Sequence, residues 1–347
     1  MSKESVMGMC ILQLAITGGV FWVFIGIAYS IFSRRKIDAE ILIITSNFVG
    51  MFLHLGCFLY MQCTGNPLVT MKPLPADLPG RTLWLCLGSC ALCGFTNYLH
   101  YKFMSKAMMR GPNGIIWNIV QCGMVFPFLM GILFFSDPAT APRVGGILLI
   151  LFSLALFGRT KNNAPGAMPA VKGQLGWFPL AILGFLCVGV NQCANLLVSY
   201  VPRGAEVPAV LRVLSITAGL LVSSMFMLAF NYKRLLPYLT KANLKLAVLL
   251  TLAMTALEPT RYFLMYPAFD HMRTLGAGAV AYPLCVCSCI IGFFLYSLIF
   301  IKEKLRPAGA LGFAAAVCGV LLLCVPARSA DAQKTPPAAS TAASTEK

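Results

Sequence analysis

The stretch LAMTALEPTRYFLMYPAFD, residues 252–270, places a carboxylate, a proline and a guanidinium in the middle of an apolar run. These groups belong to Glu258, Pro259 and Arg261. Their role depends on whether the chain folds in water or in a membrane. Of the 347 residues 59% are hydrophobic and 11% are charged. A soluble domain is about 45–50% apolar and about 25% charged. We therefore predict a membrane protein whose largest partner is the lipid bilayer.

The apolar runs have about the 20 residues that a helix needs to cross a bilayer. Charged or Pro/Gly-rich segments separate them. The pattern predicts an all-α membrane protein with ten transmembrane helices, at residues 8–33, 40–63, 82–108, 112–135, 142–160, 176–200, 208–232, 246–269, 275–301 and 307–326.

An internal repeat relates the two halves of the sequence. A shift of 164 residues aligns Thr96 with Thr260, Tyr98 with Tyr262, Gly114 with Gly278 and Gly145 with Gly309. Because five spans per half is an odd number, the halves must cross the membrane in opposite senses, as in secondary transporters. We predict a first five-helix repeat at 1–160, a cytoplasmic linker at 161–174, a second, inverted repeat at 175–326 and a disordered low-complexity tail at 327–347.

Lys and Arg are most frequent in the loops that follow odd-numbered spans, beginning with Arg34, Arg35 and Lys36. By the positive-inside rule these loops are cytoplasmic, so both termini are predicted outside the cytoplasm of a cell-membrane protein. The net charge of +16 is spread over short loops and is not gathered on a soluble module. Nucleic acid is therefore not expected as a partner.

Four segments carry a resemblance to a known family. KEKLRPAGALGFAAAVCGVLLL, residues 302–323, puts an acidic residue before a Gly-rich last helix, and PRVGGILLILFSLALFGR, residues 142–159, repeats that texture. With ten spans in a five-plus-five repeat, they resemble the drug/metabolite transporter superfamily. GGVFWVFIGIAYSIFSRRK, residues 18–36, and KGQLGWFPLAILGFLCVGVNQCAN, residues 172–195, are most similar to its rhamnose–proton symporter and sugar-uptake branch. The resemblance implies a sugar-like solute and protons as partners.

Glu258 and Arg261 are the charges that the eighth span must accommodate. A charge at the bilayer centre costs about 2.5–3.5 kcal/mol on insertion scales, so it faces a cavity or a partner. The two residues share a helix face, which Tyr262 continues, and Pro259 is expected to kink the helix. We predict that Glu258 carries a coupling proton and that Arg261 and Tyr262 contact the substrate. A permanent ion pair that holds a bent helix is the alternative.

Other spans carry amide and hydroxyl side chains at helical spacing. We predict further substrate contacts from the third, fourth and sixth spans, made by Asn97, Tyr101, Asn118, Gln121, Asn191 and Asn195. Amides and phenols bind polyols well, and hydrogen bonds between helices are the alternative role of these side chains. Lys102 is expected to extend to the membrane surface, and His54 to be a packing residue.

These features predict a secondary active transporter that moves a small polar, sugar-like solute by proton-coupled alternating access. An exporter or exchanger of amino acids or other metabolites is the alternative, and a non-transporting receptor or scaffold is a more remote one. The sequence has no HExxH, GxSxG or phosphate-binding Gly loop, so no enzyme is predicted. The cysteines are interpreted as small packing residues, so no metal or other cofactor is expected. The oligomeric state does not follow from the sequence.

The orientation is testable without a substrate. Epitope tags or single reactive cysteines placed after Pro326 should be accessible from outside intact cells. The same probes in the Arg34–Lys36 loop should react only after the membrane is permeabilised. A tag after Pro326 that is accessible only from the cytoplasm would reverse the predicted orientation.

Overall fold

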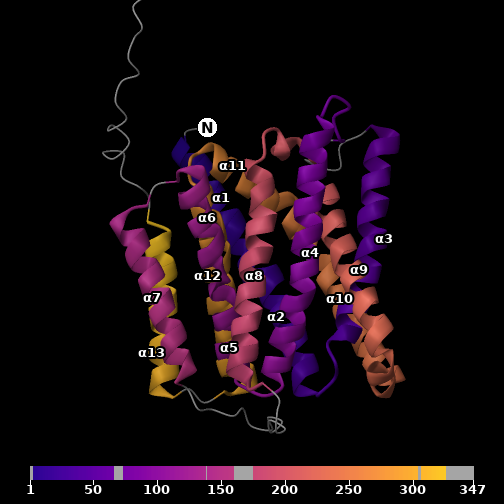
Figure 1. Cartoon of the computed structure of the whole chain (residues 1–347), viewed down its shortest axis with the longest axis vertical. Coiled ribbons are helices and arrows are strands. Elements are labelled where there is room, and N and C mark those ends of the chain that lie inside the picture. Colours follow the sequence, from indigo (N-terminus) through magenta and orange to yellow (C-terminus); the bar gives the residue numbers. More distant parts are fainter. Residues whose placement is uncertain (1–2, 66–72, 138, 160–174, 304–305, 326–347) are drawn as a thin grey trace, which may run out of the picture.

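The computed structural model describes residues 3–65, 73–137, 139–159, 175–303 and 306–325, and every regular element in these ranges is a helix. The helices run side by side along one axis (Figure 1). The predicted linker at 161–174 and the predicted tail at 327–347 lie outside the described residues.

A helix lies at each of the ten predicted ranges, and several of these helices are interrupted by a π-helical or 3-10 turn. The first half contains α1 (Lys3–Ile16), η1 (Thr17–Trp22), α2 (Val23–Arg34), α3 (Glu40–Thr64), α4 (Gly80–Met108), α5 (Asn113–Gln121), η2 (Cys122–Met124), α6 (Val125–Phe135) and α7 (Ala141–Gly158). The second half contains α8 (Trp177–Tyr200), η3 (Gly204–Glu206), α9 (Ala209–Leu235), η4 (Leu236–Tyr238), α10 (Lys241–Leu257), η5 (Arg261–Met265), α11 (Tyr266–Thr274), η6 (Gly278–Val280), α12 (Ala281–Tyr296), η7 (Ser297–Ile301) and α13 (Pro307–Leu323).

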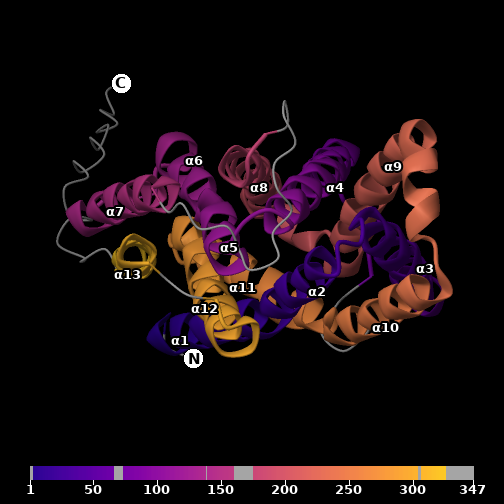
Figure 2. The same ribbon diagram turned by 90° about the horizontal axis from the view of Figure 1, so that it is seen from below.

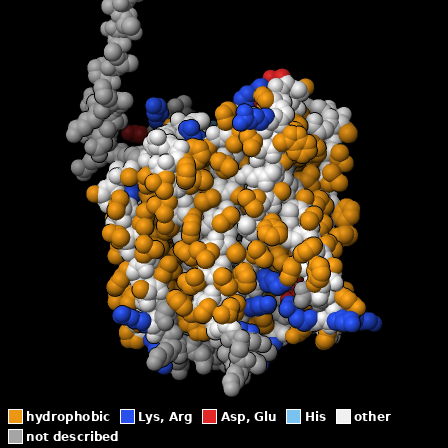
Figure 3. Space-filling view, viewed as in Figure 1, with side chains coloured by type: hydrophobic (Ala, Val, Ile, Leu, Met, Phe, Trp, Pro, Cys, Tyr) orange, Lys and Arg blue, Asp and Glu red, His pale blue; other side chains and the backbone are white. Residues whose placement is uncertain are grey.

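Within the described residues, eight helices are long and apolar enough to cross a membrane, and α7 and α13 are shorter apolar helices. Large apolar side chains cover the outside, among them Phe134, Phe230 and Phe300, which are 76%, 73% and 71% exposed. Figure 3 shows this apolar surface as a band with Lys and Arg gathered at its two edges. Such a surface is suited to lipid, so the chain is a multi-pass, all-helical membrane protein.

The eighth predicted span is interrupted where the sequence predicts a bend. The helix α10 ends at Leu257, Pro259 has no N–H to continue its ladder, and the π-helical turn η5 begins at Arg261. The Arg261 N–H bonds to the Glu258 carbonyl, 3.0 Å away, instead of to a carbonyl four residues back. The first span is widened at η1 in the same way, and there the Thr17 hydroxyl donates to the Thr260 carbonyl at 3.4 Å. The two irregular turns η1 and η5 therefore contact each other inside the bundle.

The helices are arranged around this central irregular region. Viewed along the bundle, α12 lies over α1 and beside α5, while α3, α9 and α10 form one end of the molecule (Figure 2). The helix α4 packs against both α8 and α9, and α7 packs against α13 at the other end. The centre of the bundle is thus lined by helices of both halves of the chain.

The contact between α4 and α9 depends on two glycines. A Cβ added to Gly94 would lie 2.0 Å from the Ile216 carbonyl oxygen, and one added to Gly219 would lie 2.2 Å from the Ala91 carbonyl oxygen. Neither backbone has room for a side chain, so the small residues set the distance between the two helices.

Gly94→Ala should separate α4 from α9. Overpacking of this kind costs about 1–3 kcal/mol or more, so we expect a clear fall in the melting temperature of the purified protein. Gly88→Ala is the matched control on the same helix, because a Cβ there meets no atom within 4 Å. It should leave the melting temperature unchanged or slightly raised, since Ala favours helix over Gly. Equal melting temperatures for the two variants would contradict the close crossing.

Candidate functional site

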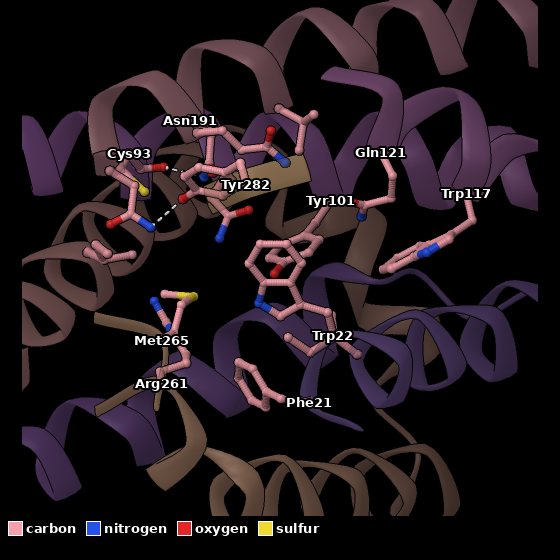
Figure 4. A pocket seen from close by; sticks show the side chains of 16 residues that line it. Phe21, Trp22, Cys93, Tyr101, Trp117, Gln121, Asn191, Arg261, Met265 and Tyr282 are labelled. Carbon is pink, nitrogen blue, oxygen red and sulfur yellow. Dashed lines mark hydrogen bonds between the residues drawn. The ribbon is translucent and has the colours of Figure 1, made fainter. Parts of the chain in front are cut away.

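A cavity, which we call the central cavity, lies inside the bundle between the two halves of the chain. It is lined by residues of both halves, namely Phe21, Trp22, Ile25, Cys93, Asn97, Tyr101, Trp117, Gln121, Val188, Asn191, Gln192, Asn195, Ile216, Arg261, Met265 and Tyr282. Figure 4 shows Phe21 beside Arg261, with Asn191 and Gln121 on the opposite side of the view. The lining combines aromatic faces, amides and a guanidinium, which is a composition that suits a small polar ligand.

Arg261 is the one charged side chain among the described residues that line the central cavity. Its Nη1 lies 2.7 Å from Oε1 of Glu258, and its guanidinium lies over the Phe21 ring, 5.7 Å from the ring centre. The widened turn η5 begins at Arg261, so the helix break directs this side chain inward. An ion pair and an aromatic face therefore hold the guanidinium at the cavity wall.

The amides of α8 bond to neighbouring helices while they line the cavity. Asn191 donates to the Cys93 carbonyl at 3.0 Å, and Asn195 donates to the Tyr282 hydroxyl at 2.6 Å (Figure 4). The Tyr266 hydroxyl donates to the Asn195 carbonyl oxygen at 3.0 Å. These asparagines thus make the hydrogen bonds between helices that were one predicted alternative, and they also line the central cavity.

A second cavity adjoins the first on the side of α3, α9 and α10, and we call it the lateral cavity. It shares Phe21, Ile25, Asn97, Tyr101, Ile216 and Arg261 with the central cavity, and its other lining residues are Tyr29, Ser46, Asn47, Gly50, Leu53, His54, Thr217, Leu220, Met254, Thr255 and Glu258. Arg261 therefore lies at the boundary between the two cavities, and its partner Glu258 lies in the wall of the lateral cavity.

His54 and Glu258 lie side by side in the wall of the lateral cavity. Its ring is 2% exposed, Nδ1 lies 3.1 Å from the Thr217 hydroxyl, and the ring meets Tyr262 edge to face. Nε2 is 3.8 Å from Oε1 of Glu258 and has no hydrogen-bond partner among the described residues. His54, predicted as a packing residue, thus packs against Thr217 and Tyr262 and also lines the lateral cavity.

The structure distributes the predicted site residues over three places. Asn97, Tyr101 and Arg261 line both cavities, while Gln121, Asn191 and Asn195 line the central cavity. Glu258 lines the lateral cavity. These seven residues are therefore close enough to act together.

Two predicted site residues lie elsewhere. Tyr262 is 4% exposed and faces a third, outer cavity. Asn118 is fully buried and lines none of the three cavities. Trp117 and Gln121, four residues apart, take the cavity-facing side of α5, and Asn118 lies about 100° away from Trp117 around the helix.

Trp22 and Tyr282 are functional candidates that the sequence analysis missed. Their rings stack 5.9 Å apart at 27° and belong to the first and ninth spans. An aromatic residue in an apolar span gives no signal of its own, because most such residues pack against lipid or other helices.

The helices α2 and α4 pack closely together on the side of the cavities that faces the basic edge of the molecule. The Tyr29 and Tyr101 rings stack 4.5 Å apart at 15°, and one turn further the Ser33 and Ser105 hydroxyls lie 3.1 Å apart. This contact lies between the cavities and the loop that carries Arg34.

A buried charge network lies next to this contact. Lys102 donates to Glu40 at 2.8 Å and to the Tyr98 hydroxyl at 2.9 Å, and Tyr98 donates to Glu40 as well. Arg234 of α9 pairs with Asp38 at 2.5 Å and with Glu40 at 3.4 Å. Lys102, which was expected to extend to the membrane surface, thus bonds through its ammonium to a buried carboxylate at the start of α3.

The third cavity, about 620 Å³ in volume, lies at the opposite edge and is called the vestibule. It is lined by Pro73, Pro75, Ala205, Glu206, Val207, Pro208, Ala209, Arg212, Tyr262, Tyr266, Pro267, Asp270, His271 and Thr274. These residues belong to the edge at which the N-terminus lies in Figure 1. Tyr266 separates the vestibule from Asn195 of the central cavity, to which it is hydrogen-bonded.

Arg212 and Asp270 form a buried ion pair in the wall of the vestibule. The Arg212 side chain is 1% exposed, and its nitrogens lie 3.0 and 3.2 Å from the two carboxylate oxygens of Asp270. It also donates to the carbonyls of Gly204 and Val207, and the Ser199 hydroxyl donates to Asp270 at 2.7 Å. The pair thus fastens α9 to α11 and to the end of α8.

Arg203 marks the rim of the vestibule. It bonds to Asp77 at 2.9 Å and to Glu206 at 2.7 Å, and its hydrogen bonds lower the pKa of both carboxyls below their usual values. These side chains are exposed, so solvent screens the interaction and its contribution to stability is small.

The size of the two inner cavities limits what they hold in this conformation. Each has a volume of about 70 Å³. Since a water needs about 10–15 Å³ on this measure, each has room for roughly five waters. A solute of a few heavy atoms fits, whereas a larger one requires the helices to move apart.

The described cysteines are all free thiols. No cluster of three or more His, Cys, Asp or Glu side chains able to hold a metal occurs in the part of the chain that the structure describes. The Cys-rich stretches of α4 and α12 are mostly buried between helices, where small side chains allow close packing.

The sequence matches no protein-family model and no curated protein. Fourteen chains of solved structures match the fold. One of them, described as "Crystal structure of protein", is 13% identical, and the match covers 93% of this chain and 97% of that chain with a TM-score of 0.50. At this identity the similarity shows the fold alone.

The Arg212–Asp270 pair generates a prediction about stability. Asp270→Asn removes the carboxylate and leaves a buried, unpaired guanidinium, which should cost about 3–5 kcal/mol and lower the melting temperature strongly. Asp77→Asn is the matched control, because that carboxylate also pairs with an arginine but is 76% exposed. It should leave the melting temperature unchanged. If both variants have the melting temperature of the wild type, the ion pair between Arg212 and Asp270 does not stabilise the fold.

Proposed function

We propose that this protein is a secondary active transporter of the drug/metabolite transporter type, which moves a small polar solute across the cell membrane by alternating access. The observation that carries the proposal is the polar central cavity, which helices of both halves enclose at mid-depth in an apolar bundle. Polar residues so far inside a membrane protein mark a solute or ion pathway by default. A scaffold would have no use for a cavity of this kind.

The packing of the helices supports an inverted repeat of five spans each. The contact of α1 with α12 has its counterpart in the contact of α8 with α5 and α6, five spans further along. The contact of α4 with α9 corresponds in the same way to that of α10 with α3. The pairs α3 with α9 and α7 with α13 are their own counterparts. An exchange of the two halves therefore preserves the main contacts.

Two acidic caps support the same repeat in detail. Asp137 follows the fourth span and accepts the Ala279 backbone N–H at 2.9 Å, and Glu303 follows the ninth span and accepts the Asn113 N–H at 2.6 Å. Ser136 and Lys302, the residues before them, both have positive φ, at 57° and 59°. Donor, acceptor and turn residue all differ by 166 positions between the halves. Each carboxylate thus caps the start of the corresponding helix in the other half.

The proposed coupling site is Glu258. It is the carboxylate that lies beside the inner cavities, whereas Asp38, Glu40, Asp270 and Glu303 lie near the ends of helices. The pair with Arg261 agrees with both predicted roles, a proton carrier and a structural ion pair. Glu258 lines the lateral cavity, and its partner Arg261 lines both cavities. This arrangement favours a change of partner during transport, which a purely structural pair would not need.

The proposed orientation puts the Arg34–Lys36 edge in the cytoplasm and the vestibule outside. Sugar-like solutes remain the first class to be tested, and amino acids and other metabolites the second. A thermal-shift screen of the purified protein finds the ligand first, because a ligand stabilises the folded form that it binds.

Glu258→Gln tests the coupling. The change keeps the size and hydrogen bonding of the side chain but fixes it as neutral. In proteoliposomes the variant should accumulate the ligand identified by the screen at least about tenfold less than the wild type does, when uptake is against the ligand's concentration gradient. Exchange of the labelled ligand should continue and become independent of pH.

The outcome separates the roles of Glu258. A variant that still concentrates the ligand under a proton gradient would exclude Glu258 as the proton carrier. A variant with a melting temperature several degrees lower and every transport mode lost would show a structural pair, because a buried Arg261 without a partner destabilises the fold. A wild-type protein that binds the ligand but neither accumulates nor exchanges it would be a receptor.

A further inference from the structure

Arg261 lies between two cavities that differ in charge. Among the described residues that line the central cavity it is the one charged side chain, whereas the lateral cavity also contains Glu258 and His54. Glu258 contacts the guanidinium through a single pair of atoms, Oε1 and Nη1, 2.7 Å apart. A guanidinium has five N–H donors, so most of its hydrogen-bonding capacity is available for a second anion.

The His54 Nε2 is a buried nitrogen with an unmet hydrogen bond. It has no partner within the described chain, although it is aimed at Oε1 of Glu258 from 3.8 Å. Buried polar atoms are normally bonded, so an exception of this kind calls for an explanation. A movement of less than 1 Å would make this contact a hydrogen bond.

The central cavity also offers acceptors and a flat apolar surface. The Gln192 side-chain oxygen is buried and without a partner among the described residues, and it lines this cavity. The stacked pair Trp22 and Tyr282 lies in the wall, 5.9 Å between ring centres. An unpartnered acceptor suits a hydroxyl donor, and an aromatic wall suits the C–H face of a polyol.

We propose that the central cavity binds the carboxylate of a small hydroxy acid at Arg261, and that His54 takes up a proton and replaces Arg261 as the partner of Glu258. This inference rests on the proposed transport function and narrows its solute class from sugar-like solutes to sugar acids and related hydroxy acids. It also assigns the coupling proton to His54, with Glu258 as the counter-ion of the imidazolium, in place of Glu258 itself.

The exchange of partners balances the charges. Before binding, the anionic Glu258 and the cationic Arg261 neutralise each other and His54 is neutral. After binding, Arg261 pairs with the incoming carboxylate, and Glu258 pairs with the imidazolium formed when a proton from water binds Nε2. One anion and one proton enter together, so no unpaired charge remains in the membrane interior at either stage.

The groups that surround His54 and Glu258 allow this exchange. From α2 and α4, Tyr29 and Tyr101 line the lateral cavity, and from η5 Tyr262 packs against the imidazole. These are phenols, which are neutral at ordinary pH. The nearest further cation on α4 is Lys102, which is bonded to Glu40. Among the described residues, Glu258 and Arg261 are therefore the charges beside His54.

The test compares acids with their neutral amides. Purified full-length protein is titrated with lactate, glycerate and gluconate, and with lactamide, glyceramide and gluconamide, with melting temperature and Trp fluorescence as readouts. At least one acid should raise the melting temperature by about 2 °C or more while its amide does not. The dissociation constant of that acid should rise about tenfold for each unit by which the pH is raised, in the range where one proton binds together with the acid.

Two conservative variants locate the site. His54→Gln should bind the acid with a dissociation constant that no longer changes with pH. Arg261→Lys keeps the charge but loses the planar fork, so binding should weaken at least about tenfold. Arg81→Lys, an exposed residue at the start of α4, is the matched control and should bind like the wild type.

Each contrary result has a defined meaning. Stabilisation by the amides alone, by both members equally or by neither member of every pair overturns the inference. If the dissociation constant of the His54→Gln variant still depends on pH, His54 is not the group that takes up the proton, and the proposed role of His54 is overturned. Proton-driven uptake of a neutral sugar would leave the transporter proposal intact while it excludes the hydroxy acid as its solute.

Discussion

The ion pair between Glu258 and Arg261 is the constraint on which the centre of this molecule depends. In a membrane each charge needs an opposite charge or water within reach, and here a contact of 2.7 Å supplies it. The pair spans the break at Pro259, so the interruption of the helix and the neutralisation of the charges belong to one local structure. The widened turns η1 and η5 meet at this point, and the two inner cavities share Arg261 in their walls.

The spans and the bend were predictable because they follow from local properties of the sequence. Run length and hydropathy define the helices, and Pro259 in an apolar run defines the interruption. It was also predictable that Asn97 and Tyr101 line the same cavity, since a spacing of four residues places both on one helix face. The proposed repeat has an offset of 164 in the sequence, and the acidic caps Asp137 and Glu303 lie 166 positions apart.

Contacts between distant parts of the chain were not predictable. Nothing in the sequence around Lys102 indicates that Glu40 lies 2.8 Å from it. In the same way, nothing around His54 indicates that Glu258 lies 3.8 Å from its ring. Hydropathy ranks such residues by polarity alone, whereas their role depends on which helix packs against them. Asn118 shows the complementary error, because a polar residue one position from a cavity-lining tryptophan still faces a different side of the helix.

The proposed repeat gives the central ion pair a further meaning. With the offset of 164, the counterparts of Glu258 and Arg261 in the first half are Gly94 and Asn97. Gly94 packs against the backbone of α9, and Asn97 is uncharged, so the first half has a tight helix crossing where the second half has two charges. Inverted halves with equal contacts would make inward- and outward-facing states nearly equal in energy. Under the proposed transport function, the ion pair would be a difference between the halves on which a solute or a proton acts to shift the balance between the two states.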